Sequence, residues 1–332
     1  MTSRARPPRI ASHARRNFLL AGAGLAFAAR ADAADDWPQR PVRLIVPYAA
    51  GGSADRLGRA IAKYLTGVLP QPVVLENKGG AGGIVGSQMV AASAPDGYTL
   101  VVSGIGSHVI APAAGGTFDP MKDFSHIALL GGPPLGLIVN SAQPYRTFEE
   151  FVAAARKPGD GISWASPGRG THGHLTGEML RALLKLNMTH IAYKGAGEAV
   201  KDVLANHVAA GCMTFSSARQ FIDAGKFRLL AVTAPKRLPD YPGAPTLAEL
   251  GYPQLTGTTW FSVSGPAGMP PDLVNRLNAE IRRGQQTPDY RQMLQQENMV
   301  LEDMDAAAFT RFVAAEIARW SSYAKQALTE EK

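Results

Sequence analysis

Short apolar runs alternate with amphipathic stretches along most of this chain. The first three runs are almost continuously apolar, which is typical of parallel strands buried on both faces of a sheet. They span residues 44–46, 73–75 and 99–103. Between them lie two helical patterns. In the first, which Ser53 is placed to cap, apolar residues from Leu57 to Val68 fall on one stripe; the second is expected over about 83–92. This alternation predicts an α/β fold.

A second α/β series follows, and it suggests a division into two lobes. Further strands are expected over 127–130, 135–140, 162–165, 190–193, 209–213, 229–233 and 258–264, and helices over 148–156, 175–183, 198–205, 272–283, 290–296 and 306–328. The stretches on either side of 137–257 have the character of paired crossover strands. We therefore expect lobe 1 to comprise 37–136 and 258–332, and lobe 2 to comprise 137–257.

The N-terminal residues have the features of an export signal. A basic leader precedes the short apolar run 18–29, and the small residues around Ala33 suit cleavage, so 1–33 is expected to be a signal peptide. Arg15-Arg16 is twin-arginine-like, and ordinary Sec export is the alternative. The signal carries +5 of the formal net charge of +7. Only +2 remains, which gives no reason to expect a nucleic-acid partner.

The remaining composition describes an ordinary globular protein. Cys212 is the only cysteine, so no internal disulfide can form, and its apolar surroundings favour a buried core residue over a nucleophile. No cysteine directly follows the apolar run 18–29, so no lipid anchor is expected there. No later stretch suits a membrane span. We expect a periplasmic monomer with no membrane anchor.

Two glycine-rich loops, each between a strand and a helix, carry the strongest functional signal. The first runs from Tyr48 to Asp55 and the second from Glu76 to Gly83. Glycine lets backbone N–H groups approach a ligand, and a helix N-terminus presents unpaired donors with a partial positive charge. Two such ends side by side predict a site for a small anion such as a carboxylate. The alternative is that both loops are plain connectors.

A third loop, at 166–174, occupies the same strand-to-helix position in the second series. Its G-x-G-x-x-G match lacks the acidic residue that a dinucleotide fold needs about 20 positions on, so no cofactor is expected. His172 and His174 have no third ligand in view, so no metal is expected either. Without a G-x-S-x-G elbow or an acid–base pair, catalysis has no anchor. The loop is expected to contact the anion through the Ser166 and Thr171 hydroxyls, backbone amides and Arg169.

At this point the chain resembles a known family, the periplasmic substrate-binding receptors of the tripartite tricarboxylate transporters, also called Bug receptors. The resemblance covers essentially the whole mature chain, in order. It rests on 43–48 with Gly51, Gly52, Ser53 and Asp55; Glu76-Asn77-Lys78 with 80–83; 94–100; Ser166 with Gly168, Gly170 and His174; 193–195; 224–226; and 231–233. It implies a two-lobed, type II periplasmic-binding-protein (Venus-flytrap) fold that closes on a carboxylate and delivers it to a membrane permease.

The resemblance also implies which residues hold the ligand. The lobe 1 loops would grip one carboxylate, and the lobe 2 loop would meet the rest. The expected ligand-binding residues are Tyr48, Ala49, Ala50, Gly51, Gly52, Ser53, Asp55, Gly79, Gly80, Ala81, Gly82, Gly83, Ser103, Ser166, Gly168, Arg169, Gly170, Thr171, His174 and Met213. Valine at Gly52 or Gly82 is expected to abolish binding without unfolding the protein.

Three departures from the family pattern refine the expectation. Ala49-Ala50 and Gly79 stand where prolines are common, which predicts less rigid loops. Met213 stands where members that bind amino acids place an Asp. We therefore expect a ligand without an α-amino group, and Met213, Phe215 and Trp260 would suit an apolar or aromatic carboxylate. Two alternatives remain: presentation of the ligand to a sensor kinase, and an exported enzyme acting on a carboxylate.

Overall fold

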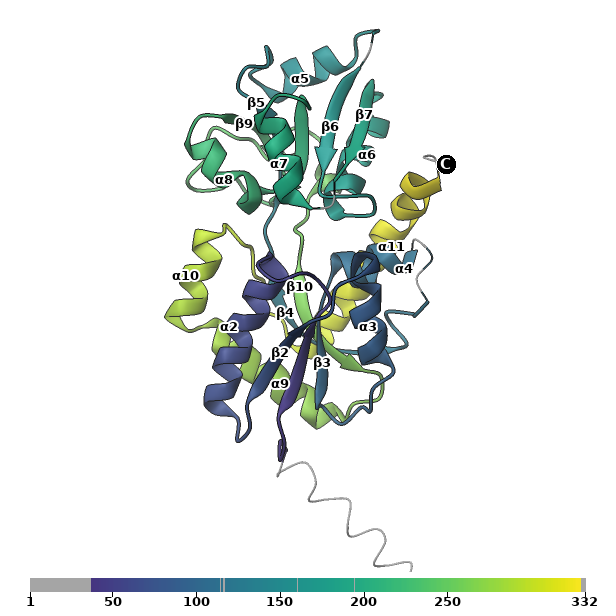
Figure 1. The fold of residues 1–332 in the computed structure, drawn as a ribbon, viewed down its shortest axis with the longest axis vertical. Coiled ribbons are helices and arrows are strands. Elements are labelled where there is room, and N and C mark those ends of the chain that lie inside the picture. Colours follow the sequence, from purple (N-terminus) through teal and green to yellow (C-terminus); the bar gives the residue numbers. More distant parts are fainter. Residues whose placement is uncertain (1–36, 114, 116, 160, 194, 330–332) are drawn as a thin grey trace, which may run out of the picture. The chain divides into compact units, whose positions relative to one another are not determined.

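The computed structural model of the protein describes residues 37–329 except 114, 116, 160 and 194, with side chains as far as 325. The predicted signal peptide therefore lies outside the described residues. The chain divides into two units at Arg40, and the fold below is that of the compact unit that begins there. Its described strands form two five-stranded sheets (Figure 1).

The first sheet contains the strands that precede the glycine loops. Its order is β2-β1-β3-β10-β4, with β1 parallel to β2 and β3, and β10 antiparallel to β3 and β4. These strands are β1 (Val42–Val46), β2 (Val73–Asn77), β3 (Thr99–Gly104), β4 (Phe124–Gly131) and β10 (Phe261–Pro266). Because β1 and β2 are parallel neighbours, the loops that follow them emerge at the same edge of the sheet.

The second sheet has the same five-stranded size and the order β7-β6-β8-β5-β9. Its strands are β5 (Leu135–Asn140), β6 (Ile162–Ser166), β7 (Met188–Ala192), β8 (Ala210–Thr214) and β9 (Phe227–Val232). The chain passes from one sheet to the other at 132–134 and again between β9 and β10. Leu135 and Gly136 thus belong to the second sheet, two residues before the boundary expected at 137.

Helices connect and cover these strands. They are α2 (Ser53–Val68), α3 (Ile84–Ala91), α4 (Ala111–Ala113), α5 (Phe148–Ala155), α6 (His172–Leu184), α7 (Ala196–Leu204), α8 (Phe215–Asp223), α9 (Pro271–Gln285), α10 (Pro288–Gln296) and α11 (Ala306–Thr329), with the short turns η1 (Ala81–Gly83), η2 (Gly106–Ile110) and η3 (Pro253–Leu255). Most match the predicted periodicity, whereas η2, α4, α8 and η3 had no counterpart in the prediction.

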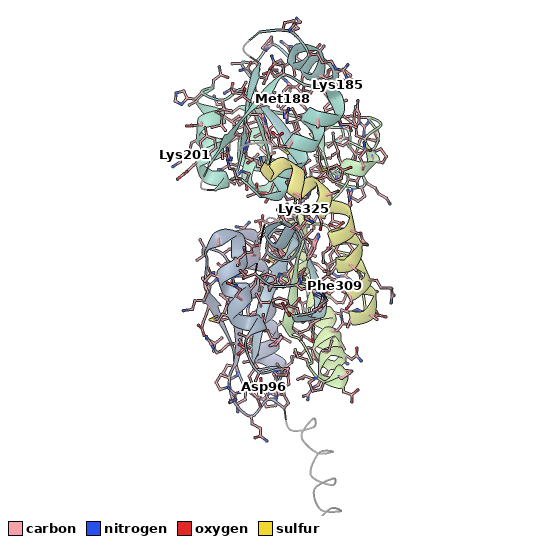
Figure 2. The ribbon with its side chains drawn as sticks, turned by 90° about the vertical axis from the view of Figure 1, so that its right-hand side faces the viewer. Asp96, Lys185, Met188, Lys201, Phe309 and Lys325 are labelled. Atoms are coloured by element: carbon pink, nitrogen blue, oxygen red, sulfur yellow. The ribbon has the colours of Figure 1, made fainter. Side chains whose placement is uncertain are left out.

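The last helix packs against both lobes. Figure 2 shows α11 passing from Phe309, which is buried beside the first sheet, toward Lys325 near its end. On the way the Trp320 ring packs edge-on against His172 of α6, with 5.0 Å between ring centroids. Glu316 of α11 accepts hydrogen bonds from Nε1 of both Trp260 and Trp320. A buried carboxylate that satisfies two indole donors fixes this helix in one position.

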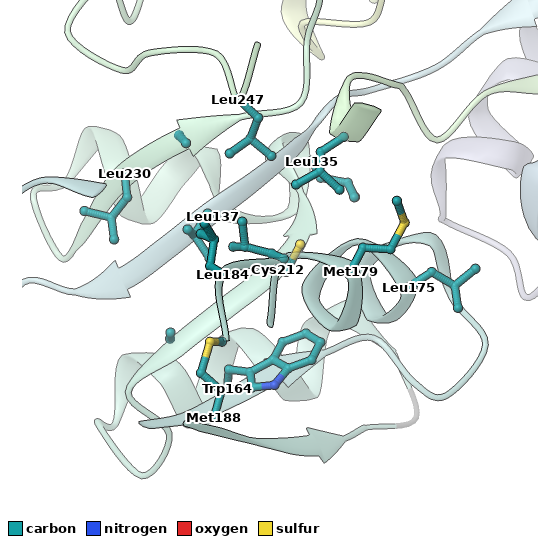
Figure 3. Close-up of a cluster of buried hydrophobic side chains, with 14 of the residues drawn as sticks. Leu135, Leu137, Trp164, Leu175, Met179, Leu184, Met188, Cys212, Leu230 and Leu247 are labelled. Atoms are coloured by element: carbon teal, nitrogen blue, oxygen red, sulfur yellow. The ribbon is translucent and has the colours of Figure 1, made fainter. Parts of the chain in front are cut away.

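The second lobe has a core on each face of its sheet. One face contributes Trp164, Leu137, Cys212 and Leu230, to which α6 adds Leu175 and Met179 (Figure 3). Trp164 lies so close to α6 that a Cβ added to Gly177 would overlap the indole ring. The other face is closed by a smaller cluster that includes Ile138, Val200 and Met213.

Candidate functional site

The first glycine loop follows β1 and ends at the N-terminus of α2. Gly51 has φ +87°, a conformation that glycine adopts without steric cost, whereas Gly52 has φ −81° and an extended ψ. Residues 49–52 are exposed. Gly52, and not the predicted Ser53, is the N-cap residue, and no side chain of the described residues caps this helix end. The first N–H groups of α2 are thus left without a side-chain acceptor.

The second glycine loop follows β2 and has a similar end. Gly80, Gly82 and Gly83 all have positive φ, and residues 79–82 are exposed. Gly83 is the N-cap residue of α3, again without a side-chain cap from the described part of the chain. A Cβ at Gly83 would stand 2.8 Å from Cβ of Ser107 and 3.2 Å from the Tyr48 hydroxyl, so the loops pack closely only because this position is glycine.

A hydrogen-bond network built on Asp55 ties the two loops together. One Asp55 oxygen accepts the Gly51 N–H at 3.0 Å and Arg59 Nε at 2.9 Å, and the other accepts Asn77 Nδ2 at 3.0 Å. The same Asn77 amide donates to the Tyr48 carbonyl at 3.1 Å. The network therefore holds β1, α2 and the end of β2 in one arrangement, with both uncapped helix ends at the same edge of the sheet.

This network gives Asp55 a role other than ligand contact. Only 3% of the residue is exposed, and burial by itself would raise its pKa. The hydrogen bonds from Arg59, Gly51 and Asn77 outweigh burial and hold the pKa of this carboxyl below its ordinary value. Both carboxylate oxygens of Asp55 thus bond groups of the protein that organise the loops, and its contact with a ligand stays a prediction.

Tyr48 fills the space between the loops. Its hydroxyl hydrogen-bonds Ser107, and burial raises its pKa. A Cβ at Gly106 would stand 3.0 Å from the same hydroxyl. Gly106 and Ser107 belong to η2, a π-helical turn that sequence reasoning missed, so a third element of the first lobe supports the loops. The only feature of the sequence that pointed to this turn was Gly-x-Gly-Ser at the end of β3. This position lies at the same edge of the sheet as the other two loops.

The loop of the second lobe is organised by its own side chains. Thr171 caps α6, with its hydroxyl oxygen accepting the His174 N–H at 3.3 Å, and donates to the Gly168 carbonyl at 2.8 Å. The Ser166 hydroxyl is buried and contacts Gly168 and, at 2.8 Å, Nε2 of His190. Gly170 donates its N–H to Nδ1 of the buried His174. These hydrogen bonds shape the loop and engage Gly168 and the Gly170 N–H, whereas Arg169 between them is exposed.

The loops of the two lobes come close together near η2. A Cβ added to Gly170 would stand 4.0 Å from a methyl group of Ile110, the last residue of η2. Nearby, Nδ1 of His172 hydrogen-bonds the Thr259 hydroxyl across the two lobes at 3.0 Å. Burial, with a smaller effect of Arg319, lowers the pKa of His172 to about 3, so this ring is neutral in the folded protein.

Four residues expected at or near the ligand are instead in the interior. Met213 has no exposed surface and packs among Ile138, Val200 and the other members of its core cluster. Phe215 packs edge-on against Tyr241, and Trp260 donates to Glu316. Ser103 is buried between the Ser262 and Ser264 hydroxyls, at 2.6 and 2.8 Å. These buried positions do not support the predicted contacts of Met213 and Ser103 or the aromatic pocket inferred from Phe215 and Trp260, and those contacts stay predictions.

Comparison with known proteins places the chain in a family. The sequence pattern of the tripartite tricarboxylate transporter family receptor matches residues 57–327. Over 294 residues the chain is 35% identical to the UPF0065 protein in the gbd 5′ region of Cupriavidus necator. This match covers 89% of each of the two chains. The chain belongs to the tripartite tricarboxylate transporter receptor family, whose members are periplasmic solute-binding receptors and not enzymes. This confirms the resemblance drawn from the sequence.

Two solved structures of similar proteins contain carboxylates. Rpa4515 of R. palustris with adipate is 30% identical, with a TM-score of 0.79 over 88% of this chain and 98% of that one. MatC (Rpa3494) from Rhodopseudomonas palustris with bound malate is 30% identical, with a TM-score of 0.77 over 87% and 100% of the two chains. These similarities confirm the two-lobed α/β fold of a periplasmic binding protein.

Two further observations concern the described residues alone. None of their helices combines the length and apolar character that crossing a bilayer requires. Nor do they contain a cluster of three or more His, Cys, Asp or Glu side chains arranged to hold a metal ion.

Proposed function

We propose that this receptor captures a small carboxylate with the two glycine loops of its first lobe and encloses it with the loop at 168–170 of the second. The single observation that carries the proposal is the pair of helix N-termini without side-chain caps, each preceded by exposed loop residues, that the Asp55 network holds at one edge of the sheet. Unpaired N–H donors and the positive ends of two helices suit an anion. The bound carboxylates of the two solved relatives support the same ligand class.

The donors available are sufficient for useful affinity. A hydrogen bond to a charged group contributes roughly 1.5–3 kcal/mol, and a micromolar dissociation constant corresponds to about 8 kcal/mol. About three to five such bonds would therefore supply that free energy. Closure then adds contacts from the second lobe, which shifts the equilibrium toward the enclosed form.

The ligand lacks an α-amino group under this proposal, although for a reason other than Met213. The second-lobe loop proposed to enclose the ligand, 166–174, contains no Asp or Glu in its sequence. An ammonium group enclosed there would have no carboxylate to pair with, and burying an unpaired charge is costly. Adipate and malate, found in the solved relatives, carry no amino group. Because Phe215 and Trp260 are buried, the proposal does not extend to an aromatic ligand.

The proposal also assigns a cellular role. The receptor is exported by residues 1–33, acts in the periplasm as a monomer, and delivers its ligand to a permease of the tripartite tricarboxylate type. Delivery to a sensor kinase is the competing output. Deleting the gene distinguishes the two, because loss of carboxylate uptake supports the permease, whereas unchanged uptake with a lost transcriptional response supports the sensor.

A thermal-shift panel tests the ligand class. The mature protein is tested with millimolar adipate, malate, citrate, benzoate, aspartate and glutamate. A ligand at about 100 times its dissociation constant stabilises the folded state by roughly 2.7 kcal/mol, which is a readily measured rise in melting temperature. A rise with one or more plain carboxylates is expected. A rise with aspartate or glutamate alone would contradict the proposal.

A further inference from the structure

The C-terminal end of α10 is the meeting point of two arginines that come from different lobes. Arg219 of α8, in the second lobe, donates to the carbonyl of Gln296, the last residue of α10. Both helices are labelled in Figure 1. The next residue, Glu297, accepts a hydrogen bond from Arg56 of α2 at 2.8 Å. Consecutive residues at one helix end thus contact α8 of the second lobe and α2 of the first.

The Arg219 contact has favourable electrostatics. The last carbonyls of a helix have no intrahelical partner and carry a partial negative charge. A guanidinium group donates a hydrogen bond to such a carbonyl and also offsets that charge. Arg219 is held in position within its own lobe by Asp223, at 3.7 Å from Nε, and by Asp240, at 3.4 Å from Nη2. Its side chain is 30% exposed, which leaves the contact moderately screened.

The Arg56 contact leads from the same helix end to the first glycine loop. Nη1 of Arg56 donates to the Gly51 carbonyl at 2.7 Å while Nη2 bonds Glu297. Gly51 is also the residue whose N–H Asp55 accepts. Displacement of the α10 end therefore acts on the loop proposed to hold the carboxylate.

A cavity with a mainly apolar lining adjoins this contact. This cavity of about 410 Å³ lies between the segments 234–240 and 294–300, and Asp240 and Gln295 line it. Asp240, which also contacts Arg219, places the Arg219 hydrogen bond beside this cavity.

We propose that Arg219 is a positioning residue for ligand capture: it holds the second lobe against the end of α10, and Glu297 and Arg56 connect that end to the first glycine loop. Lobe closure and carboxylate capture thereby stabilise each other. The effect on affinity rests on the proposed function, whereas the effect on lobe separation does not.

The first experiment measures lobe separation without ligand. Spin labels on Lys63→Cys of α2 and Lys201→Cys of α7 report the distance between the lobes, and the buried Cys212 stays unlabelled. Arg219→Ala is expected to shift the distribution toward longer distances. Arg237→Ala is the matched control, since the bonds that the structure describes for Arg237, to Glu249 and the Pro242 carbonyl, lie within the second lobe. Identical distributions for Arg219→Ala and the unsubstituted protein would overturn the proposal.

The second experiment measures affinity for a carboxylate that the panel identifies. Arg219→Ala is expected to bind about tenfold more weakly through faster dissociation, and Arg237→Ala within twofold of wild type. In a double-mutant cycle, Arg219→Ala and Glu297→Gln together should cost less than the product of the two single effects. Independent effects would remove the connection to the glycine loop. If no carboxylate binds, the proposed function fails, and the spin-label result still decides the role of Arg219.

Discussion

Replacing Asp55 by Asn tests whether the loops depend on the network beneath them. The substitution keeps the size of the side chain but places an NH₂ group against one of three donors, from Gly51, Arg59 and Asn77. The Arg59 pair contributes little because 56% of that side chain is exposed. One lost charge-assisted bond to a buried partner costs about 1.5–3 kcal/mol, and relief of the buried charge offsets part of it. We expect a net loss of about 2 kcal/mol of unfolding free energy.

The larger effect is expected on ligand affinity. If the held loop conformation falls to between about 1% and 10% of the population, the apparent dissociation constant rises roughly 10- to 100-fold. Urea unfolding measures stability, and calorimetric titration with a carboxylate from the panel measures affinity. Arg59→Gln is the control and should change either quantity only slightly. Unchanged affinity in Asp55→Asn, or a greater loss in Arg59→Gln, would refute the role assigned to Asp55.

Three further predictions concern the interior. Burial lowers the pKa of His108 well below 6.5, that of His126 to about 4 and that of His172 to about 3. These rings stay neutral in the folded protein but take up protons when it unfolds, so the free energy of unfolding should fall as pH drops from 6.5 toward 4, by up to about 4 kcal/mol per pH unit. Equal urea midpoints at pH 7 and pH 5 would contradict this. Gly177→Ala should destabilise by about 3 kcal/mol or more because the added methyl would meet Trp164, whereas Gly197→Ala in open space on α7 should stabilise by about 0.5–1 kcal/mol, both measured by urea unfolding. Burial raises the pKa of Cys212 to about 12, so the native protein should react with a thiol reagent only at its unfolding rate, and rapid labelling would place this thiol at the surface.

The sequence pattern predicted the strands well because buried parallel strands are continuous apolar runs. It located β1, β2 and β3 within a few residues, and the α/β alternation led to two sheets. It missed η2, where Gly104 and Gly106 interrupt any helical period and the turn is π-helical. It also missed α8, where Phe215 was interpreted as a pocket residue. A single aromatic residue has no signature that separates a pocket wall from a core.

The loops were predictable as backbone features, but the roles of their side chains were not. Glycine content and strand-to-helix position indicated both helix ends. Asp55 was counted as a ligand contact because nothing local shows that its partners are Asn77, 22 residues on, and the Gly51 amide. Met213 follows Cys212, and adjacent strand residues face opposite sides of a sheet. Because helices cover both sides of this sheet, both residues are buried. The alternation of strand residues between the two faces does not show that both faces are covered.

Calorimetric titration of Gly52→Val tests the central claim most directly. Gly52 has φ −81° and no described atom within 4 Å of an added Cβ, so valine fits the fold and changes only the surface offered to the carboxylate. Gly82→Val is less suitable, because φ +66° strains any branched side chain and adds a folding defect. Gly67→Val, also in open space on α2, is the matched control. We predict loss of carboxylate binding in Gly52→Val with stability lowered by no more than about 1 kcal/mol, because valine is a poorer N-cap residue than glycine, and retained binding in Gly67→Val. Wild-type affinity in Gly52→Val would show that the glycine loops do not hold the ligand.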